Sequence, residues 1–380
     1  MKILHITFEA PGEKSGGALG VYQSANSILS TGNQVDYIGP EFEGINLEYR
    51  NKFFLSKDKN KLQTLKSLVL SATPSIYINS FFKITKGIKE NSYDVIYIDF
   101  SRYWVIAKWA RKICNRVIVR VHNIESEYLF EIFKNRKSVK ALIKYLYVRK
   151  FEKKCLNYAS DIIFLTKNDQ ETAQNLYHIN IEKTSVIPVC IEKKIIKKKT
   201  IGTICLTYTG SLNFPMNSKG ILFFIDYIWD DLLKCYPTIE LVIAGKKPTK
   251  ELIDKIGKHS NIKLYNTPSE KEMNNIFNNT NIYIAPVFNG AGMKVKVAEA
   301  LSYGLLVVGT EHALIGYDAA ITANYAVVAN SIKDWKNNIL YYISNINHTK
   351  NLRQNILAMF NNNYSMTCSQ RAINRIIRKM

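Results

Sequence analysis

The sequence predicts an α/β protein built from two Rossmann-like, doubly wound domains. Its 380 residues exceed an ordinary single domain and suit two domains of about 190 residues each. Hydrophobic residues make up 47% of the chain, which is enough for two buried cores. Short apolar runs rich in Val, Ile and Tyr alternate with longer amphipathic stretches along the whole chain. This alternation is typical of buried parallel strands joined by helices.

The apolar runs fall into two sets, separated by a charged segment that lacks the periodicity of a core. The first set of predicted strands lies at 2–8, 34–39, 94–99, 116–121, 161–166 and 185–188. The second set lies at 204–209, 239–244, 262–265, 282–286 and 305–309. We therefore expect a first domain at 1–190, a linker at 191–202 and a second domain at 203–360. Residues 361–380 follow as a loop at Asn361–Tyr364 and a final helix at about 366–379, which can pack back on the first domain.

Neither the start of the chain nor its cysteines indicate membrane insertion or a metal site. No run reaches 18 apolar residues, and the first ten residues predict a buried strand, broken by His5 and Glu9, in place of a signal peptide. The six cysteines have no CxxC spacing and no histidine partners, so they predict core thiols in a reducing cytoplasm. No Asp-x-Asp motif is present, and we expect neither a metal nor another cofactor.

The net charge of +21 has three explanations. A compositional bias toward Lys, Ile and Asn would place lysines on every solvated face. Alternatively, the charge attracts the chain to an anionic membrane surface on its cytoplasmic side. Nucleic acid is the third partner that such a charge can serve, but it is not expected because no nucleic-acid-binding motif accompanies the charge.

The segment 285–304 carries the strongest chemical pattern in the chain. A predicted strand ends at Pro286, a loop with Gly290 and Gly292 follows, and a helix is predicted to open near Met293. Small loop residues let backbone N–H groups approach an anion, and a helix N-terminus adds about half a positive charge. The segment therefore predicts a phosphate-binding loop.

Three charged side chains support a phosphate site in this segment. Lys294 and Lys296 lie in the first helical turn, where cations are unfavourable unless an anion binds. Glu299 lies one turn beyond Lys296 on the same face, where its carboxylate can accept hydrogen bonds from ribose hydroxyls. The alternative is a surface ion pair between Lys296 and Glu299, with glycines that only turn the chain.

The pattern Gly-x-Gly-x-Lys-x-Lys-x-x-Glu-Ala-x-x-x-Gly at 290–304, followed by Val-Val-x-Thr and Gly316, resembles the donor-site signature of GT-B glycosyltransferases. It is similar to bacterial members of the retaining family-4 group. The resemblance implies two domains facing across a cleft, with Glu299 as the ribose-binding second glutamate of a Glu-x7-Glu motif. The position of the first glutamate is occupied by Ala291, so the motif does not identify the donor sugar.

Two further segments of the second domain resemble the same family. In Tyr208–Gly220, which looks like the segment that grips the pyrophosphate, Ser211 follows Gly210 where many members have arginine. Lys219 is the candidate phosphate cation there, or else a solvated lysine at a helix start. Asn217 is expected to cap a helix that begins at about 218.

The strand and turn near the nucleotide base form the second of these segments. Gly245 either permits close backbone approach or only turns the chain. Asn266-Thr-Pro268 stands where the family usually has a glycine that receives the base, so this segment does not identify the nucleotide base of the donor.

In the first domain, Gly16 and Gly17 follow the first strand, where the family has a loop that lines the cleft; the alternative is a plain turn. Arg120 and His122 share one face at the end of a strand and match the family's Arg-x-His-Asn-x-Glu segment, whose histidine contacts the transferred sugar. Glu125 and Glu127 are either general bases or the acidic first turn of the next helix.

The segment 133–154 combines nine lysines and arginines with aromatic and aliphatic residues at helical spacing. A basic amphipathic helix is typical of a membrane-surface element, and relatives with lipid-linked acceptors use basic first-domain faces in this way. An ordinary solvated helix face is the alternative.

The resemblance implies a metal-independent, hexosyltransferase-type glycosyltransferase, in which sugar moves from a nucleotide-diphosphate donor to a lipid-linked or polysaccharide acceptor of lipopolysaccharide or capsule synthesis, with retention. The expected catalytic residues are His122, Lys294 and Lys296. The expected donor-binding residues are Gly16, Gly17, Gly210, Ser211, Lys219, Gly245, Gly290, Ala291, Gly292, Met293 and Glu299. A sugar-nucleotide epimerase of the same fold, or a catalytically weak partner subunit of a glycan-assembly complex, remains the alternative.

Overall fold

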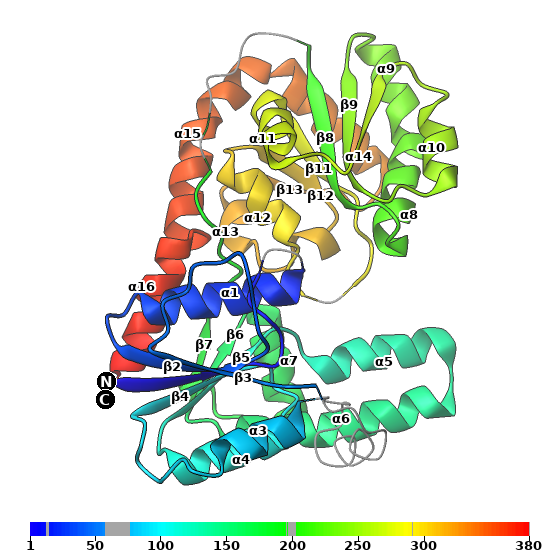
Figure 1. Ribbon diagram of the computed structural model, residues 1–380. Coiled ribbons are helices and arrows are strands. Elements are labelled where there is room, and N and C mark those ends of the chain that lie inside the picture. The colour runs from blue at the N-terminus through cyan, green and yellow to red at the C-terminus, as the bar shows by residue number, and fades with distance from the viewer. Residues whose placement is uncertain (13–14, 58–76, 195, 197–202, 291, 380) are drawn as a thin grey trace. The chain divides into compact units, whose positions relative to one another are not determined.

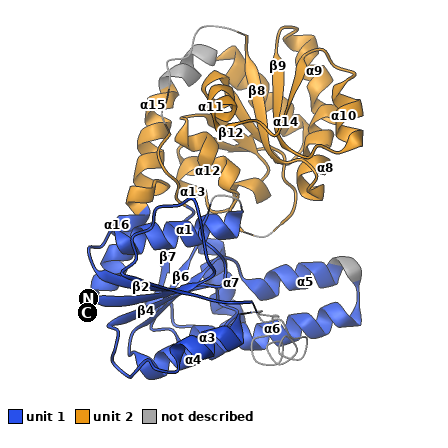
Figure 2. Ribbon diagram, in the orientation of Figure 1, with its two compact units in different colours: residues 1–189, 369–380 blue, residues 190–368 orange. Residues whose placement is uncertain are grey.

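The computed structural model describes residues 1–12, 15–57, 77–194, 196, 203–290 and 292–379. The chain divides into two compact units (Figures 1 and 2). Unit 1 contains residues 1–189 and 369–380, and unit 2 contains residues 190–368. Each unit holds one parallel sheet with helices, so the predicted class of two Rossmann-like sheets is confirmed.

Unit 1 is a seven-stranded parallel sheet in the order β3-β2-β1-β4-β5-β6-β7. Its strands are β1 Lys2–Ile6, β2 Gln34–Gly39, β3 Asn51–Phe54, β4 Val95–Asp99, β5 Val117–Val121, β6 Asp161–Phe164 and β7 Thr184–Val186. Its helices are α1 Gly16–Leu29, α3 Ile78–Thr85, α4 Trp104–Ile113, α5 Glu125–Arg136, α6 Val139–Tyr158 and α7 Lys167–Tyr177, with a 3₁₀ turn at Ile181–Lys183. Strand β3 was not predicted because all four of its residues are exposed at the sheet edge, so it lacks a buried apolar run.

Unit 2 is a six-stranded parallel sheet in the order β10-β9-β8-β11-β12-β13. Its strands are β8 Cys205–Ser211, β9 Glu240–Lys246, β10 Ile262–Asn266, β11 Ile282–Ala285, β12 Leu306–Gly309 and β13 Ala326–Val328. Its helices are α8 Pro215–Phe224, α9 Asp230–Cys235, α10 Lys250–Ile256, α11 Glu270–Asn279, α12 Val295–Ser302, α13 Asp318–Thr322, α14 Ile332–Ser344 and α15 Ile346–Asn363. A π-helical turn at Ile225–Trp229 joins α8 to α9, and a 3₁₀ turn spans His312–Leu314.

The end of the chain differs from the predicted loop at Asn361–Tyr364. Helix α15 continues to Asn363, and only two residues separate it from α16, Met366–Arg378. Phe360 and Tyr364 are buried, so their packing keeps this asparagine-rich stretch helical against its local preference. From Ser369 onward α16 belongs to unit 1, where Arg116 Nη1 donates to the Ile377 carbonyl at 2.7 Å.

Each sheet has a strand pair where the direction of winding reverses. In unit 1 this is β1 beside β4, and in unit 2 it is β8 beside β11. Open α/β sheets bind ligands outside the carboxyl ends of such strands, because the loops there diverge and leave a crevice. The residues that follow these strands are therefore the candidates for function.

Candidate active site

The loop between β11 and α12 needs glycine at two positions. Gly290 has φ 103° and Gly292 has φ 73°, a left-handed backbone conformation that side chains disfavour. A Cβ on Gly290 would also lie 2.7 Å from the sulfur of Met216 on α8. Ala291, between the two glycines, lies outside the described residues. The glycines thus allow the sharp path from sheet to helix that was predicted.

Helix α12 begins at Val295, two residues later than predicted, so Lys294 is its N-cap residue and not part of its first turn. Lys294 Nζ donates to the carbonyls of Gly290 at 2.7 Å and Gly292 at 2.8 Å, which closes the loop on itself. Tyr317 OH donates to the Lys294 carbonyl at 2.7 Å and accepts from Ala298 N at 3.0 Å. The loop and the first turn of α12 are therefore held by side chains around them.

Lys296, in the first turn of α12, reaches the end of β8 and the start of α8. Its Nζ donates to Asn217 Oδ1 at 2.8 Å and to Tyr208 OH at 3.1 Å, and it lies 4.4 Å from the centre of the Tyr208 ring. Desolvation of this half-buried ammonium, and then repulsion from Lys294, lower the pKa of Lys296 to about 7. The contacts differ from the alternative of a surface pair with Glu299, since both hydrogen-bond partners of the ammonium are neutral.

Asn217 does not cap a helix at 218, contrary to the prediction. Helix α8 begins at Pro215, because proline is favoured as the first helical residue, and Asn217 lies inside its first turn. Its Nδ2 donates to the Ser211 carbonyl at 3.0 Å while its Oδ1 accepts from Lys296. Asn217 therefore joins the end of β8 to α12, a role that sequence reasoning missed although Pro215 marked the true helix start.

Gly210 and Gly245 are required by close contacts. A Cβ on Gly210 would lie 3.1 Å from Lys296 Nζ and equally close to Asn217 Nδ2. A Cβ on Gly245 would lie 1.8 Å from the Gly210 carbonyl oxygen, so the close approach at Gly245 is to the neighbouring strand. Ser211 is exposed at the end of β8 and directly follows Gly210.

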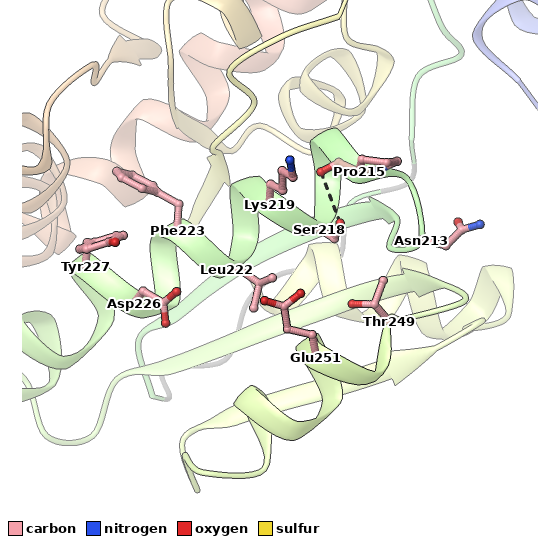
Figure 3. A pocket seen from close by; sticks show the side chains of 10 residues that line it. All are labelled: Asn213, Pro215, Ser218, Lys219, Leu222, Phe223, Asp226, Tyr227, Thr249 and Glu251. Carbon is pink, nitrogen blue, oxygen red and sulfur yellow. Dashed lines mark hydrogen bonds between the residues drawn. The ribbon is translucent and has the colours of Figure 1, made fainter.

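Lys219 lies on α8, on a different side of the helix from Asn217. It stands two positions beyond Asn217, about 200° around the helix, and its side chain is exposed. It lines a pocket of about 410 Å³ beside α8 and α10, together with Asn213, Pro215, Ser218, Leu222, Phe223, Asp226, Tyr227, Thr249 and Glu251 (Figure 3). One turn to either side of Lys219 on α8, Met216 lies beside Gly290 and Phe223 packs on Phe288, so Lys219 stays the candidate phosphate cation near the β11–α12 loop.

Glu299 lies one turn into α12, half-buried near two tyrosines. Burial, and then the nearby Glu299 carboxylate, raise the pKa of Tyr303 to about 12. The same two causes raise the pKa of Tyr283, whose hydroxyl contacts Thr209 Oγ1 at 2.8 Å. Met293, another predicted donor residue, is buried.

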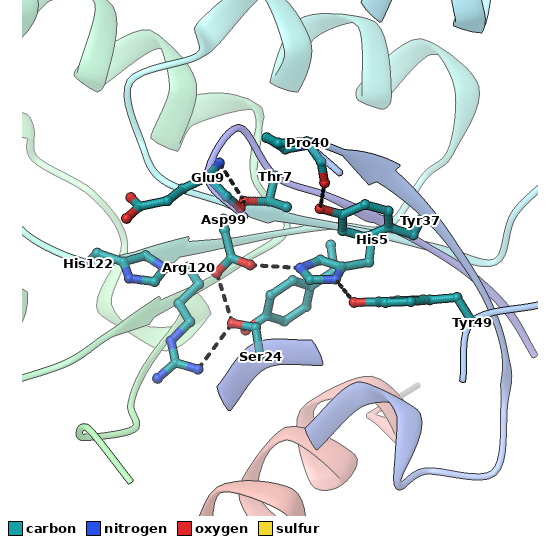
Figure 4. Close-up of polar contacts among 11 residues, drawn as sticks. His5, Thr7, Glu9, Ser24, Tyr37, Pro40, Tyr49, Asp99, Arg120 and His122 are labelled. Carbon is teal, nitrogen blue, oxygen red and sulfur yellow. Dashed lines mark hydrogen bonds and ion pairs between the residues drawn. The ribbon is translucent and has the colours of Figure 1, made fainter. Parts of the chain in front are cut away.

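In unit 1, His122 follows β5 and contacts Asp99 at the end of β4, with 2.8 Å between His122 Nε2 and Asp99 Oδ1 (Figure 4). The other carboxylate oxygen of Asp99 lies 2.7 Å from Nε2 of His5. Arg120 is fully buried and donates from Nη1 to Ser24 Oγ at 3.2 Å. Sequence reasoning missed Asp99 and His5, because they lie within apolar strand runs that give no motif.

The loop after β1 carries Glu9. A Cβ on Gly17 would lie 2.4 Å from Glu9 Oε2, so this glycine leaves space for the carboxylate, which also accepts from Ser15 Oγ at 2.9 Å. Gly16, the first residue of α1, is exposed with open space around it, and the Ser15 hydroxyl caps the helix by accepting from Ala18 N at 3.0 Å.

Glu125 and Glu127 occupy the first turn of α5, which is one of the two predicted alternatives. The buried Glu152 carboxylate accepts from the backbone N–H of Glu125 at 3.0 Å and of Ser126 at 3.1 Å. Glu152 thereby anchors the start of α5. Within the described ranges, no three His, Cys, Asp or Glu side chains are arranged to hold a metal ion.

Helices α5 and α6 form an antiparallel pair that encloses a small core around Leu129, Tyr145, Val148 and Phe151 (Figure 1). On the outer side of α6, three apolar side chains at i, i+4 and i+7 are 72%, 61% and 53% exposed: Val139, Ile143 and Leu146. Lys140, Lys144 and Lys150 are exposed on the same helix. No described helix is long and apolar enough to cross a bilayer.

Comparison with known proteins identifies a curated relative and solved structures that resemble the chain. A curated relative, an uncharacterised 44.6 kDa protein of the cps region of Klebsiella pneumoniae, is 25% identical over 96% of both chains. Sucrose-phosphate synthase from Thermosynechococcus elongatus superposes with a TM-score of 0.72 at 12% identity, covering 100% of this chain and 98% of the synthase. The Anabaena protein HepE, solved with UDP-glucose, gives a TM-score of 0.68 at 14% identity over the whole of both chains.

Family models match both parts of the chain. Residues 15–194 match glycosyltransferase family 4, and residues 203–345 match the group 1 glycosyl transferases. The two matched ranges contain the loop after β11, the Lys296 cluster and the strand end that carries His122. The chain therefore belongs to the group 1, family 4 glycosyltransferases and has their GT-B fold.

Proposed function

We propose that this protein transfers a sugar from a nucleotide-diphosphate donor to a lipid-linked or saccharide acceptor of cell-surface glycan synthesis, with retention of configuration. The observation that carries the proposal is the Lys296 ammonium at the end of β8, held by the neutral groups of Asn217 and Tyr208. A partly desolvated cation with neutral partners is suited to an anionic ligand. The relative from a cps region supports a role in capsule synthesis.

In the proposed reaction, an acceptor hydroxyl bonds to the anomeric carbon as the bond between that carbon and the diphosphate breaks. Negative charge grows on the departing diphosphate, which takes up the hydroxyl proton. Lys296, Lys294 and the backbone N–H groups of the Gly290–Met293 loop stabilise that charge, the term that is usually largest in catalysis. Glu299 accepts hydrogen bonds from the ribose, and His122 contacts the transferred sugar. Gly16, Gly17, Gly210, Ser211 and Gly245 are assigned to the surroundings of the donor.

A thermal-shift and turnover experiment tests the proposal. UDP-glucose is the first probe because HepE has been solved with it, and GDP-mannose is the second because residues 266–268 leave the base open. Donor at about 100 times its Kd is expected to stabilise unit 2 by about 2.7 kcal/mol, since it binds only the folded state. Transfer of radiolabelled sugar to a lipid or polysaccharide extract should follow. Epimerisation of the nucleotide-sugar in the absence of an acceptor would show that the protein is an isomerase and would contradict the proposed transfer.

We also propose that α6 contacts an anionic membrane surface, with Val139, Ile143 and Leu146 entering the interface and the surrounding lysines facing lipid phosphates. Replacing these three residues by serine is expected to weaken binding to vesicles with about 30% anionic lipid by tenfold or more, because each buried aliphatic side chain contributes about 1.5–3 kcal/mol. Flotation of the protein with such vesicles measures the effect.

Ile332→Ser is the matched control for the membrane variants, since Ile332 is a similarly apolar residue that is 38% exposed in unit 2. It should leave flotation unchanged. Raising the salt to about 0.5 M should weaken binding of the wild-type protein by screening the lysines. Flotation that survives both the triple substitution and high salt would show that α6 is an ordinary solvated helix.

A further inference from the structure

A buried polar cluster in unit 1 holds the ring of His122 in one orientation (Figure 4). Asp99 is at its centre and is fully buried, as is His5, while His122 is 5% exposed. The two carboxylate oxygens of Asp99 are divided between the imidazoles, with Oδ1 at 2.8 Å from His122 Nε2 and Oδ2 at 2.7 Å from His5 Nε2. His5 Nδ1 in turn lies 2.7 Å from Tyr49 OH.

The carboxylate determines which ring nitrogen of His122 carries hydrogen. Burial alone would raise the pKa of Asp99, but hydrogen bonds from His122 and His5 hold that pKa below its usual range, so the group is ionised. An ionised carboxylate only accepts hydrogen bonds. Nε2 of His122 is therefore the N–H nitrogen, and in the neutral ring Nδ1 is left with its lone pair.

A nearby buried cation balances the charge of Asp99. The Ser24 hydroxyl donates to Asp99 Oδ1 at 2.8 Å and accepts from Arg120 Nη1 at 3.2 Å, so a single hydroxyl links carboxylate and guanidinium. Both charged groups are fully buried, which makes the loss of either one costly. The cluster thus keeps Asp99 ionised in the interior.

The Phe100 ring and the backbone of α1 restrict the His122 ring on two further sides. Phe100 stacks on His122 with 4.2 Å between ring centres and an interplanar angle of 23°. Phe100 also has φ 76°, a left-handed conformation that is strained for a bulky residue and that proteins retain chiefly at functional sites. On α1, a Cβ on Gly20 would lie 2.4 Å from both Cε1 and Nδ1 of His122, so the backbone of α1 packs against this edge of the ring and only glycine leaves room for it.

We propose that Asp99, supported by His5, is a positioning residue that fixes the orientation and the Nε2–H tautomer of His122, the histidine assigned to the transferred sugar. The proposal rests on the proposed function for its substrate, but the tautomer can be measured without any substrate. The stacked Phe100 ring and the close backbone of Gly20 restrict movement of the His122 ring.

Two readouts test this assignment in the full-length protein. In ¹⁵N-histidine spectra, the wild-type His122 signal, assigned by comparison with His122→Gln, should show hydrogen on Nε2. Asp99→Asn should shift this signal toward a mixture of tautomers, because the amide can donate as well as accept. In the transfer assay, kcat should fall by about 30- to 100-fold, as expected for a misdirected hydrogen bond. The KM for UDP-glucose should change by less than threefold, which corresponds to less than about 0.7 kcal/mol in binding free energy.

Asp94→Asn is the matched control, since Asp94 precedes the same strand and accepts from Lys2 N at 2.7 Å without touching His122. It should change neither the spectrum nor kcat. Gly20→Ala supplies a second variant if Asp99→Asn folds poorly, and it should displace the ring and lower kcat with KM preserved. A wild-type His122 protonated on Nδ1, or an Asp99→Asn spectrum and kcat equal to wild type, would overturn the proposal. Absence of any transfer by the wild type would refute the proposed function alone, because the spectra still decide the tautomer.

Discussion

Lys296→Met is expected to lower kcat/KM for sugar transfer by about 100- to 1,000-fold, the loss found when one electrostatic donor to a developing negative charge is removed. The ammonium lies at the end of β8 with neutral partners, where it can bind the diphosphate without first leaving a carboxylate. Methionine preserves the length and most of the volume of the side chain, so packing against Tyr208 should survive. Initial rates with saturating acceptor, together with a melting curve for each variant, measure the effect.

Two lysines of unit 2 serve as controls for Lys296→Met. Lys333→Met removes an exposed charge at the start of α14 and should leave kcat/KM unchanged. Lys219→Met tests whether Lys219 joins Lys296 at the diphosphate, because Lys219 lines the pocket beside α8 and α10. A loss for Lys219→Met as large as that for Lys296→Met would show that the two lysines act in one site.

Donor binding is expected to weaken as the pH rises above about 7. Desolvation and Lys294 lower the pKa of Lys296 to about 7 in the unliganded protein, and a bound diphosphate raises it again. Binding therefore takes up protons between these two pKa values, and the Kd for UDP-glucose should rise by about 30-fold from pH 6 to pH 8.5. Below pH 7 the lysine is already protonated and the Kd should level off.

Titration calorimetry in buffers of different ionisation enthalpy measures this proton uptake, which should be about 0.7 proton per site at pH 7.5. UDP-glucose is a better probe than UDP, because both of its phosphates are esterified and do not titrate in this range. Lys296→Met should remove the uptake and flatten the profile. Wild-type binding that is independent of pH and buffer would place the diphosphate away from Lys296.

The sequence predicted the sheets well because parallel strands buried on both faces are continuous apolar runs. It missed β3 and β13, which are short edge strands: all four residues of β3 are exposed, and only Ala326 is buried in β13, so neither gives such a run. It placed the start of α8 three residues too late and the start of α12 two residues too early, because Phe214 and Lys294 are not typical cap residues. Helix ends are decided by local packing as well as by propensity.

The site was predicted in the parts that a motif reveals. The glycines of the β11–α12 loop and the lysines after them could be found because their spacing is local in sequence. Asn217, Asp99 and His5 could not, since their roles come from contacts with Lys296 and His122, residues far from them along the chain. A histidine in an apolar strand looks the same in sequence whether it packs in a core or orients another residue.

The absence of a side chain at Gly210 determines how many cations the donor site can hold at the end of β8. The space beside Gly210 holds one ammonium, supplied by α12, and Lys294 is already committed to the carbonyls of its own loop. An arginine at position 211 would bring a second cation beside the first, and the two would repel each other unless a diphosphate lay between them. The charges at positions 211 and 296 are therefore coupled, since a cation at 211 would be destabilised by Lys296 when no diphosphate is bound. A substitution at only one of them alters the charge of the whole donor site.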